Sequence, residues 1–165
     1  MNMQELLNTM PQVGRVEWIS IRSADRAPVT PVTEVVVTPE SGLAGDHYRG
    51  TSKKRQVTLI QAEHLAGVAA ILGKDRIDPE LTRRNIVVSG INLLAFSERQ
   101  FQIGEVIMEM TGYCHPCSRM EENLGPGGYN AMRGHGGITA RVVRGGLIRQ
   151  GDQVRLLEAD ADKKE

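Results

Sequence analysis

The fold class is indicated most directly by one stretch of the chain, Phe101-Gln-Ile-Gly-Glu-Val-Ile-Met-Glu-Met110, in which apolar and polar residues alternate. Alternation of this kind is typical of strands that bury one face and expose the other. The same texture recurs on both sides of this stretch. It predicts further strands at Arg15–Arg22, Thr33–Thr38, Gln56–Gln61, Asn85–Ser89, Ile138–Val143 and Gln153–Leu157.

Only one convincing helix accompanies these strands. It runs from Ala62 to Leu72 and ends at Gly73, where a C-terminal glycine is favoured. The regular alternation of strands and helices that a parallel α/β sheet requires is missing. We therefore predict a mainly β protein, a barrel or sandwich with short helices. One domain is expected over residues 15–157, with a lead-in over 1–14 and a polar, disordered tail over 158–165.

The composition limits the possible partners and compartments. The 165 residues include 20 basic and 20 acidic side chains, so no global field would attract nucleic acid or a membrane surface. The N-terminus lacks a secretory signal, and no apolar run is long enough to span a bilayer. The two cysteines are too few for a disulfide framework. We expect reduced thiols in a cytoplasmic protein.

Both cysteines lie in one motif, Cys114-His-Pro-Cys117. Its spacing fits a redox-active thiol pair, half of a zinc site or a thiolate donor to a soft metal. A thioredoxin-like pair should open a long helix after an early strand, whereas Gly125 would end a helix starting at Ser118 after about two turns. The motif also comes late in a β-rich chain, which counts against that chemistry.

A zinc site would need two more ligands. The remaining candidates, His47, His64 and His135, are scattered without a second paired spacing. Free cysteines are often inert buried residues, which is a further alternative. We favour a partly open site instead, because Pro116 and the polar residues after Cys117 predict irregular backbone there. His64, among apolar neighbours in the predicted helix, is interpreted as structural.

Polar groups elsewhere could hold a ligand. Arg83-Arg84-Asn85 immediately precedes a buried strand and could bind a phosphate or the edge of a pterin ring, with a solvated charge pair as the alternative. Asp46-His47 could face a ligand or merely stabilise a turn. The glycine-rich stretches after residue 124 are interpreted as tight turns, and Lys53-Lys54-Arg55 as a solvated loop.

In this order, the segments resemble the MOSC family, named for the C-terminal domain of molybdenum cofactor sulfurases. The likeness covers roughly residues 15–157, and no single motif carries it alone. The matching segments are Gly42-Leu-Ala-Gly-Asp-His47, Arg83-Arg-Asn-Ile-Val-Val-Ser-Gly90, Phe101-Gln-Ile-Gly-Glu105, Cys114-His-Pro-Cys-Ser-Arg119, Gly136-Gly-Ile-Thr-Ala-Arg-Val-Val143 and residues 145–152.

The resemblance implies a mixed-strand β-barrel and a molybdenum cofactor (molybdopterin). Members such as the mitochondrial amidoxime reducing component and the hydroxylaminopurine-resistance proteins reduce N-hydroxylated compounds. The family's metal-ligating cysteine aligns with Cys117, leaving Cys114 as a non-ligating neighbour. The family's cofactor contacts align with Arg83 and Asn85. We add Asp46 or His47 as cofactor-supporting or proton-relay groups.

This implied function has further requirements. The chain has no flavin or iron–sulfur motif, so a separate reductase would supply electrons to reduce a small N-hydroxylated substrate. The amidoxime-reducing proteins grip the pterin with a further N-terminal β-barrel region that this chain does not contain. A homodimer could replace those contacts, or cofactor binding could be lost. Two other functions stay open, a sulfur carrier with a persulfide on Cys117 and a non-catalytic anion-binding module.

Overall fold

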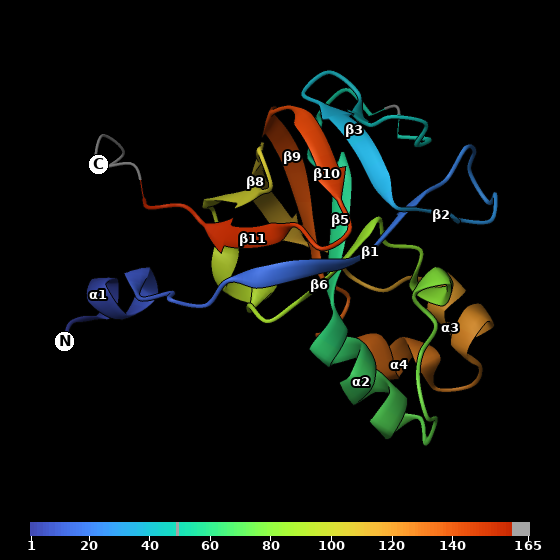
Figure 1. The fold of residues 1–165 in the computed structure, drawn as a ribbon. Helices are drawn as coiled ribbons and strands as arrows, with labels where there is room; N and C mark the ends of the chain where they lie inside the picture. Colours follow the sequence, from blue (N-terminus) through green and yellow to red (C-terminus); the bar gives the residue numbers. More distant parts are fainter. Residues whose placement is uncertain (49, 160–165) are drawn as a thin grey trace.

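A closed β-barrel forms the centre of the molecule in the computed structural model, which describes residues 1–48 and 50–159 (Figure 1). Pairing of the first and last barrel strands at Gly14 and Val154 closes the barrel. Among the described strands, β5 and β6 are the one neighbouring pair that is parallel, so the barrel is mixed. In sheet order, its seven strands are β11 (Gln153–Leu156), β7 (Gln100–Ile103), β8 (Val106–Tyr113), β9 (Ile138–Arg144), β5 (Val57–Gln61), β6 (Ile86–Ser89) and β1 (Gly14–Ile21).

The mainly β fold predicted from the alternating stretches is therefore confirmed. The stretch 101–110 forms a hairpin of β7 and β8, and its turn falls at Gly104, whose φ is +57°. Because two turn residues separate the strands, the buried positions shift from odd to even numbers across the turn. The inward side chains from this stretch are Phe101, Ile103, Val106, Met108 and Met110.

One helix-containing crossover explains the parallel pair. Parallel strands cannot be joined by a tight hairpin, and here α2 (Ala62–Ile71) and the 3-10 helix η1 (Pro79–Thr82) connect β5 to β6. Strands covered on both faces are expected to be apolar throughout. Accordingly, Leu59 and Val88 point into the barrel, whereas Ile60 and Val87 pack under the helices.

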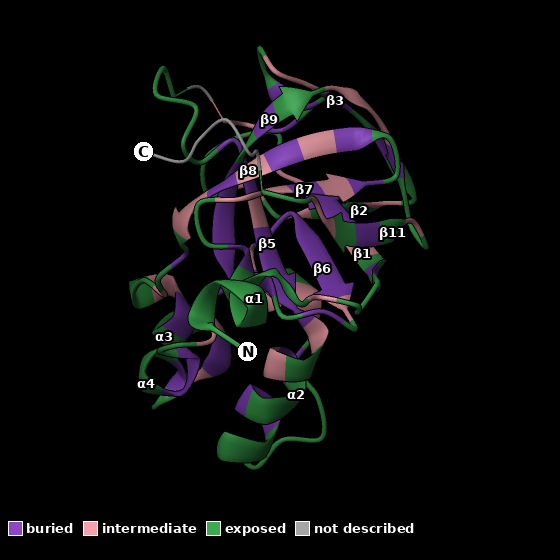
Figure 2. Ribbon diagram, turned by 90° about the vertical axis from the view of Figure 1, so that its left-hand side faces the viewer, coloured by how far each residue is buried: buried purple, intermediate pink, exposed green. Residues whose placement is uncertain are grey.

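A layer of helices covers one end of the barrel, below it in Figure 1. Besides α2, it contains α3 (Ser118–Leu124) and α4 (Gly128–Met132). Figure 2 shows that each of these helices has buried residues. Met120, Leu124 and Met132 share a second core with Ile60. The predicted end of a helix at Gly125 is confirmed, because Gly125 caps α3.

The other elements are not strands of the barrel wall, although Val37, Ile148 and Phe96 from them belong to the core of the barrel. A small sheet contains β10 (Gly146–Arg149), β3 (Glu34–Thr38) and β4 (Gly42–Leu43). Strand β2 (Thr30–Val32) extends the edge of β1, and the 3-10 helix η2 (Leu93–Phe96) precedes β7. None of the helices among the described residues is long and apolar enough to cross a membrane.

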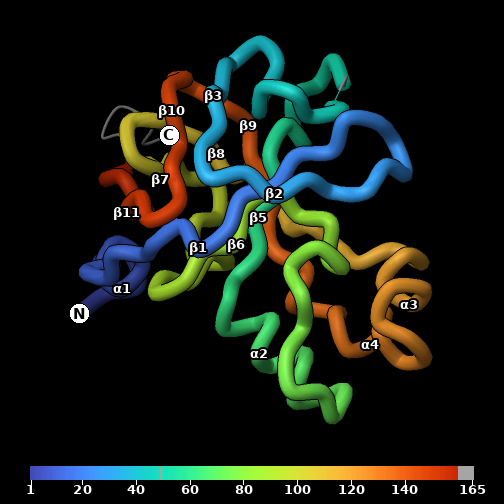
Figure 3. The backbone as a smooth tube through the Cα atoms, turned by 45° about the vertical axis from the view of Figure 1, so that its right-hand side comes forward, coloured from blue at the N-terminus to red at the C-terminus, as the bar shows by residue number. Residues whose placement is uncertain are grey.

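The predicted lead-in contains a short helix, α1 (Met3–Asn8), that lies apart from the helical layer (Figure 3). The Asn2 side chain accepts a hydrogen bond from Glu5 N, and the Glu5 carboxylate accepts one from Asn2 N. This capping box satisfies two backbone donors of a helix that buries no residue. The predicted disordered tail falls mostly on residues 160–165, which lie outside the described residues.

Candidate functional site

The two cysteines end in different surroundings although three peptide bonds separate them. Strand β8 delivers Cys114 to the barrel end, where its backbone N–H donates to the Gly137 carbonyl at 2.8 Å. Cys114 is buried, and the Arg55 guanidinium lies 3.7 Å from its sulfur. Cys117 caps α3 with an extended backbone and is exposed. Only Cys117 is therefore open to an incoming ligand.

Two glycines allow the segment of residues 114–117, which we call the cysteine loop, to lie against the barrel. A Cβ at Gly136 would stand 2.0 Å from the Cys114 carbonyl oxygen. A Cβ at Gly137, where φ is +90°, would stand 1.9 Å from the Leu59 carbonyl oxygen. No side chain fits in either place, so this close approach depends on glycine. Residues 134–137, interpreted from the sequence as a tight turn, therefore also allow the chain to pack closely.

Arg83 stands beside the exposed thiol. It is the left-handed C-cap of η1, with φ +58°, and its Nη2 donates to the Ala27 carbonyl at 3.0 Å. Its Nε is buried and has no hydrogen-bond partner among the described residues. Burial lowers the pKa of Arg83, as do the neighbouring Arg22 and Arg119, whereas Asp25 and Cys117 raise it. Arg83 therefore lies among charged groups and close to the Cys117 thiol.

Arg84 points the other way and is almost fully buried. Its Nε donates to the Gly136 carbonyl at 2.8 Å, Nη1 to the Thr82 carbonyl at 3.1 Å and Nη2 to the His115 carbonyl at 3.4 Å. Burial is the main factor that lowers its pKa, and Cys114 opposes that effect. Arg84 thus joins η1, the cysteine loop and the glycine turn from beneath.

Asn85 and Asp46 also face inward. The Asn85 Oδ1 accepts from Thr58 N and Oγ1 at 3.0 and 3.2 Å, while its Nδ2 donates to Ser20 O and Asp46 Oδ1 at 3.2 and 3.3 Å. Asp46 also accepts from the Arg22 N–H at 2.9 Å. Both side chains are buried. They hold the strands beneath the site, and cofactor contact by either one stays a prediction.

These positions form two groups. We call Cys114, Arg84, Asn85 and Asp46 the floor, because all four are buried and take part in internal contacts. We call the exposed Cys117, Arg83 and the charged residues that act on Arg83, namely Arg22, Arg119 and Asp25, the rim. An ion pair of 3.5 Å joins Arg119 of α3 to Asp25 of the β1–β2 loop.

The histidines do not gather into one cluster among the described residues. His47 is half-buried, and no hydrogen bond or ion pair connects its ring to the described part of the rim. His64 instead meets His135, with ring centroids 5.0 Å apart in an edge-on arrangement. Across the described residues, no group of three or more histidine, cysteine or acidic side chains could hold a metal ion.

The rim includes residues that sequence analysis missed. Arg22 and Arg119 lie far apart in sequence and have no motif of their own, so only the fold brings them to Arg83. Arg55 was interpreted as part of a solvated loop, and it is exposed, but its guanidinium also reaches Cys114. Arg119 could have been predicted from the sequence, because it follows Cys117 by two positions in the cysteine motif segment.

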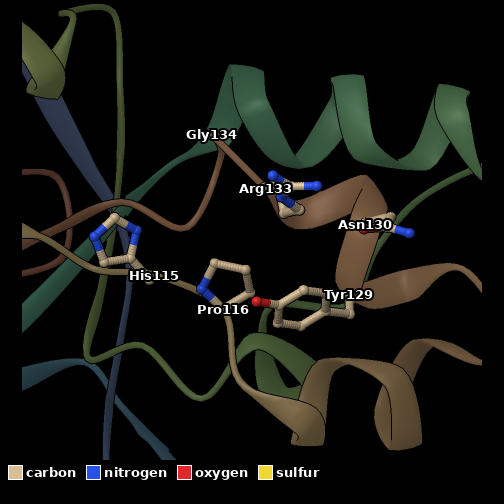
Figure 4. Close-up of a pocket in the computed structure, with 6 residues that line it drawn as sticks. All are labelled: His115, Pro116, Tyr129, Asn130, Arg133 and Gly134. Carbon is tan, nitrogen blue, oxygen red and sulfur yellow. The ribbon is translucent and has the colours of Figure 1, made fainter.

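A hollow of about 650 Å³ lies next to the cysteine loop (Figure 4). One wall is His115 and Pro116, which precede Cys117. The other wall comes from the segment between the two glycine turns, where α4 forms. Sequence analysis expected only turns there, so this wall was not foreseen. The hollow is lined by His115, Pro116, Tyr129, Asn130, Arg133 and Gly134.

The residues present fit a molybdenum cofactor. An exposed thiol can supply the soft thiolate that molybdenum accepts, and the adjacent guanidinium groups suit a phosphate or pterin oxygen. The buried Arg83 Nε is the most specific observation, because a buried donor without a partner is costly unless a ligand satisfies it.

Comparisons with solved structures find proteins of similar fold. The chain resembles the YuaD protein of Bacillus subtilis, with a TM-score of 0.75 and 18% identity over 92% of this chain and 100% of that one. It also resembles YiiM from Geobacillus stearothermophilus, with a TM-score of 0.70 and 17% identity over 88% and 75% of the two chains. For YiiM from Escherichia coli, the TM-score is 0.67 and the identity 18%, over 90% and 72%.

These structural likenesses concern the fold, since the identities are low. No curated protein sequence matches the chain. The family model of the MOSC domain matches residues 45–155, which include the cysteine motif, Arg83 and most of the barrel. The chain therefore belongs to the MOSC domain family.

Proposed function

We propose that this protein binds a molybdenum cofactor through Cys117 and reduces N-hydroxylated compounds. The observation that carries the proposal is the pairing of an exposed thiol with Arg83, whose buried Nε has no partner among the described residues. A ligand that accepts a hydrogen bond from Nε and a bond from the sulfur would satisfy both groups at once. Family membership supports a domain of the cofactor-binding type.

The bound metal would supply two-electron chemistry, in which R–NHOH, two protons and two electrons give R–NH₂ and water, the electrons coming from a separate reductase. Cys117 Sγ would hold the metal at the start of α3. Arg83 and Arg119 would hold anionic oxygens of the cofactor by charge-assisted hydrogen bonds. Asp25, paired with Arg119 at 3.5 Å, would keep that guanidinium over the site.

In this proposal the floor residues position the groups that bind the cofactor and do not contact the cofactor themselves. Arg84 fixes the His115 carbonyl and Gly136, so it sets where the loop leaves the barrel. Asp46 anchors the backbone of Arg22, and Asn85 joins Asp46 to the barrel strands. Such supporting hydrogen bonds orient the groups that bind a metal centre. Asp46 therefore acts as a positioning residue, whereas a proton-relay role for His47 stays a prediction.

Activity measurement tests the proposal. Protein produced in cells that synthesise the cofactor is supplied with electrons from reduced methyl viologen and with benzamidoxime, and benzamidine formation is followed. We expect turnover by the wild type and none by Cys117→Ser. Arg83→Gln should weaken cofactor retention by about tenfold or more, because a hydrogen bond from a charged donor is lost. Arg76→Gln, an exposed arginine elsewhere, serves as the matched control.

The competing sulfur-carrier function predicts a different result in the same preparation. Intact-mass analysis would then show a sulfur-sized adduct on Cys117, together with absence of bound pterin and of benzamidine formation. That outcome would overturn the reductase proposal. Equal activity of the wild type and Cys117→Ser would also overturn it.

A further inference from the structure

The hollow beside the cysteine loop is built from polar groups that the protein itself does not use. The Arg133 guanidinium, the Tyr129 hydroxyl, the Asn130 amide and the His115 ring make no side-chain hydrogen bond or ion pair with the described residues. Four different hydrogen-bonding side chains therefore line one open space, although the Asn130 amide points away from Pro116 in Figure 4. Polar groups that converge in a pocket typically orient a ligand.

The wall formed by α4 is held rigidly against the helix that begins at Cys117. Glu121 of α3 accepts hydrogen bonds from the Gly127 and Tyr129 backbone N–H groups at 2.7 and 2.9 Å. These two bonds lower the pKa of Glu121, so it stays ionised and keeps the contact. Met120 and Met132 are buried in the core shared by the two helices. The hollow and Cys117 thus belong to one packed unit.

The shape of the hollow favours a flat ligand. Tyr129 and Arg133 are four residues apart at α4 and its C-cap, so they lie on the same side of the helix. In Figure 4 the Tyr129 side chain extends toward Pro116, which lies on the opposite wall. The two rings offer apolar surfaces to a planar group. Tyr129 is 40% exposed, so its ring is available for stacking.

The charge of the hollow favours an anion. Arg133 is its only charged lining residue apart from the titratable His115, and no carboxylate lines it in the described structure. Glu121, the nearest acidic group named above, is already occupied by backbone donors. The planar guanidinium of arginine matches a carboxylate with two parallel hydrogen bonds.

We propose that this hollow is the substrate subsite and that it selects planar, negatively charged N-hydroxylated compounds. The inference rests on the proposed function, and it adds the chemical class of the substrate. The aromatic ring would lie between Tyr129 and Pro116, with its carboxylate on Arg133. Because His115 and Pro116 line the hollow and lead directly to Cys117, the N–OH end would reach toward the thiol.

Binding to cofactor-free protein tests the subsite apart from catalysis. Calorimetric titration compares 4-carboxybenzamidoxime with the neutral compound benzamidoxime. We expect the wild type to bind the carboxylate compound about tenfold more tightly, as one partly exposed charge-assisted contact allows. Arg133→Gln should remove this preference and leave the neutral compound unaffected. Arg76→Gln, which removes an exposed arginine that does not line the hollow, should keep the preference.

Tyrosine variants test the stacking role. Tyr129→Phe keeps the ring and should bind both compounds nearly as the wild type does, whereas Tyr129→Leu should weaken both. Equal affinity of the wild type for the two compounds, or a preference that survives Arg133→Gln, would overturn the subsite. Cys117→Ser should bind both compounds normally. A normal binding pattern in a protein that never acquires cofactor would instead contradict the proposed reductase while leaving the anionic subsite established.

Discussion

The floor and the rim of the site occupy the same end of the barrel but differ in how completely the protein uses their polar groups. The side chain of Asn85 in the floor makes four hydrogen bonds to protein atoms. Arg83 in the rim leaves a buried Nε without a partner among the described residues, and Cys117 is exposed. The floor is therefore a structural support, whereas the rim has capacity left for a ligand.

This difference separates residues that a family resemblance groups together. Arg83 and Asn85 are two positions apart, and both were predicted to bind cofactor. Their side chains diverge, since the Arg83 backbone is left-handed while Asn85 enters strand β6 with its amide turned inward. Substitutions in the floor should consequently reduce folding stability, and substitutions in the rim should reduce ligand binding.

The largest effect is expected at the glycine turn that supports the floor. Gly137→Ala places a methyl group 1.9 Å from the Leu59 carbonyl oxygen at a φ of +90°, so backbone must move. We expect a loss of about 3 kcal/mol or more in the free energy of unfolding. Urea denaturation followed by circular dichroism measures it.

Gly134→Ala is the matched control, because Gly134 has a φ of +83° but open space around its Cβ position. Only the left-handed conformation opposes this substitution, at a cost of about 1 to 2 kcal/mol. If the two variants lose equal stability, the close approach at Gly137 does not constrain the loop.

A somewhat smaller effect is expected when the floor loses its central amide. Asn85→Ala leaves the Thr58 N–H and the Ser20 carbonyl without this buried partner. The expected loss in the free energy of unfolding is about 2 to 3 kcal/mol. Asn130→Ala, at an exposed position in α4, should change it by less than about 0.5 kcal/mol. A floor role for Asn85 is wrong if its variant is as stable as the Asn130 variant.

The smallest effect concerns the pH dependence of folding stability. It involves His64, which belongs to neither the floor nor the rim. Burial lowers the pKa of His64 below its usual 6.5, His135 lowers it further, and Glu63 opposes them. Between that lowered pKa and 6.5, the unfolded chain binds more protons than the folded chain. Stability should therefore fall as the pH drops below 6.5, and level off once it is below the lowered pKa.

Replacement of His64 tests this contribution. His64→Gln should show a weaker decline in melting temperature between pH 7 and pH 5 than the wild type. A decline of identical steepness would assign the pH dependence to other groups.

Much of the fold could be predicted from local sequence patterns. The strands around Val16, Leu59 and Val88 follow from alternating or β-branched apolar residues, and α2 follows from its length and from Gly73. The parallel pairing of β5 with β6 was not foreseen, because apolar runs do not report direction. Helix α4 was missed because its five residues lie between two glycine turns.

The candidate site could be predicted only in part. Spacing revealed the cysteine motif, but the burial of Cys114 and exposure of Cys117 depend on how the loop packs against Gly136 and Gly137. Arg22 and Arg119 join Arg83 through loops that are distant in sequence. Such long-range proximity has no local signature, so the rim emerges only in the folded molecule.

The central claim is that the exposed thiol of the rim, and not the buried thiol of the floor, holds molybdenum. It is tested most directly by molybdenum and pterin content in protein made by cells that synthesise the cofactor. We predict about one metal per chain in the wild type, retention in folded Cys114→Ser, and loss of both metal and pterin in Cys117→Ser. Full molybdenum and pterin content in Cys117→Ser, or zinc in place of molybdenum in the wild type, would contradict the claim.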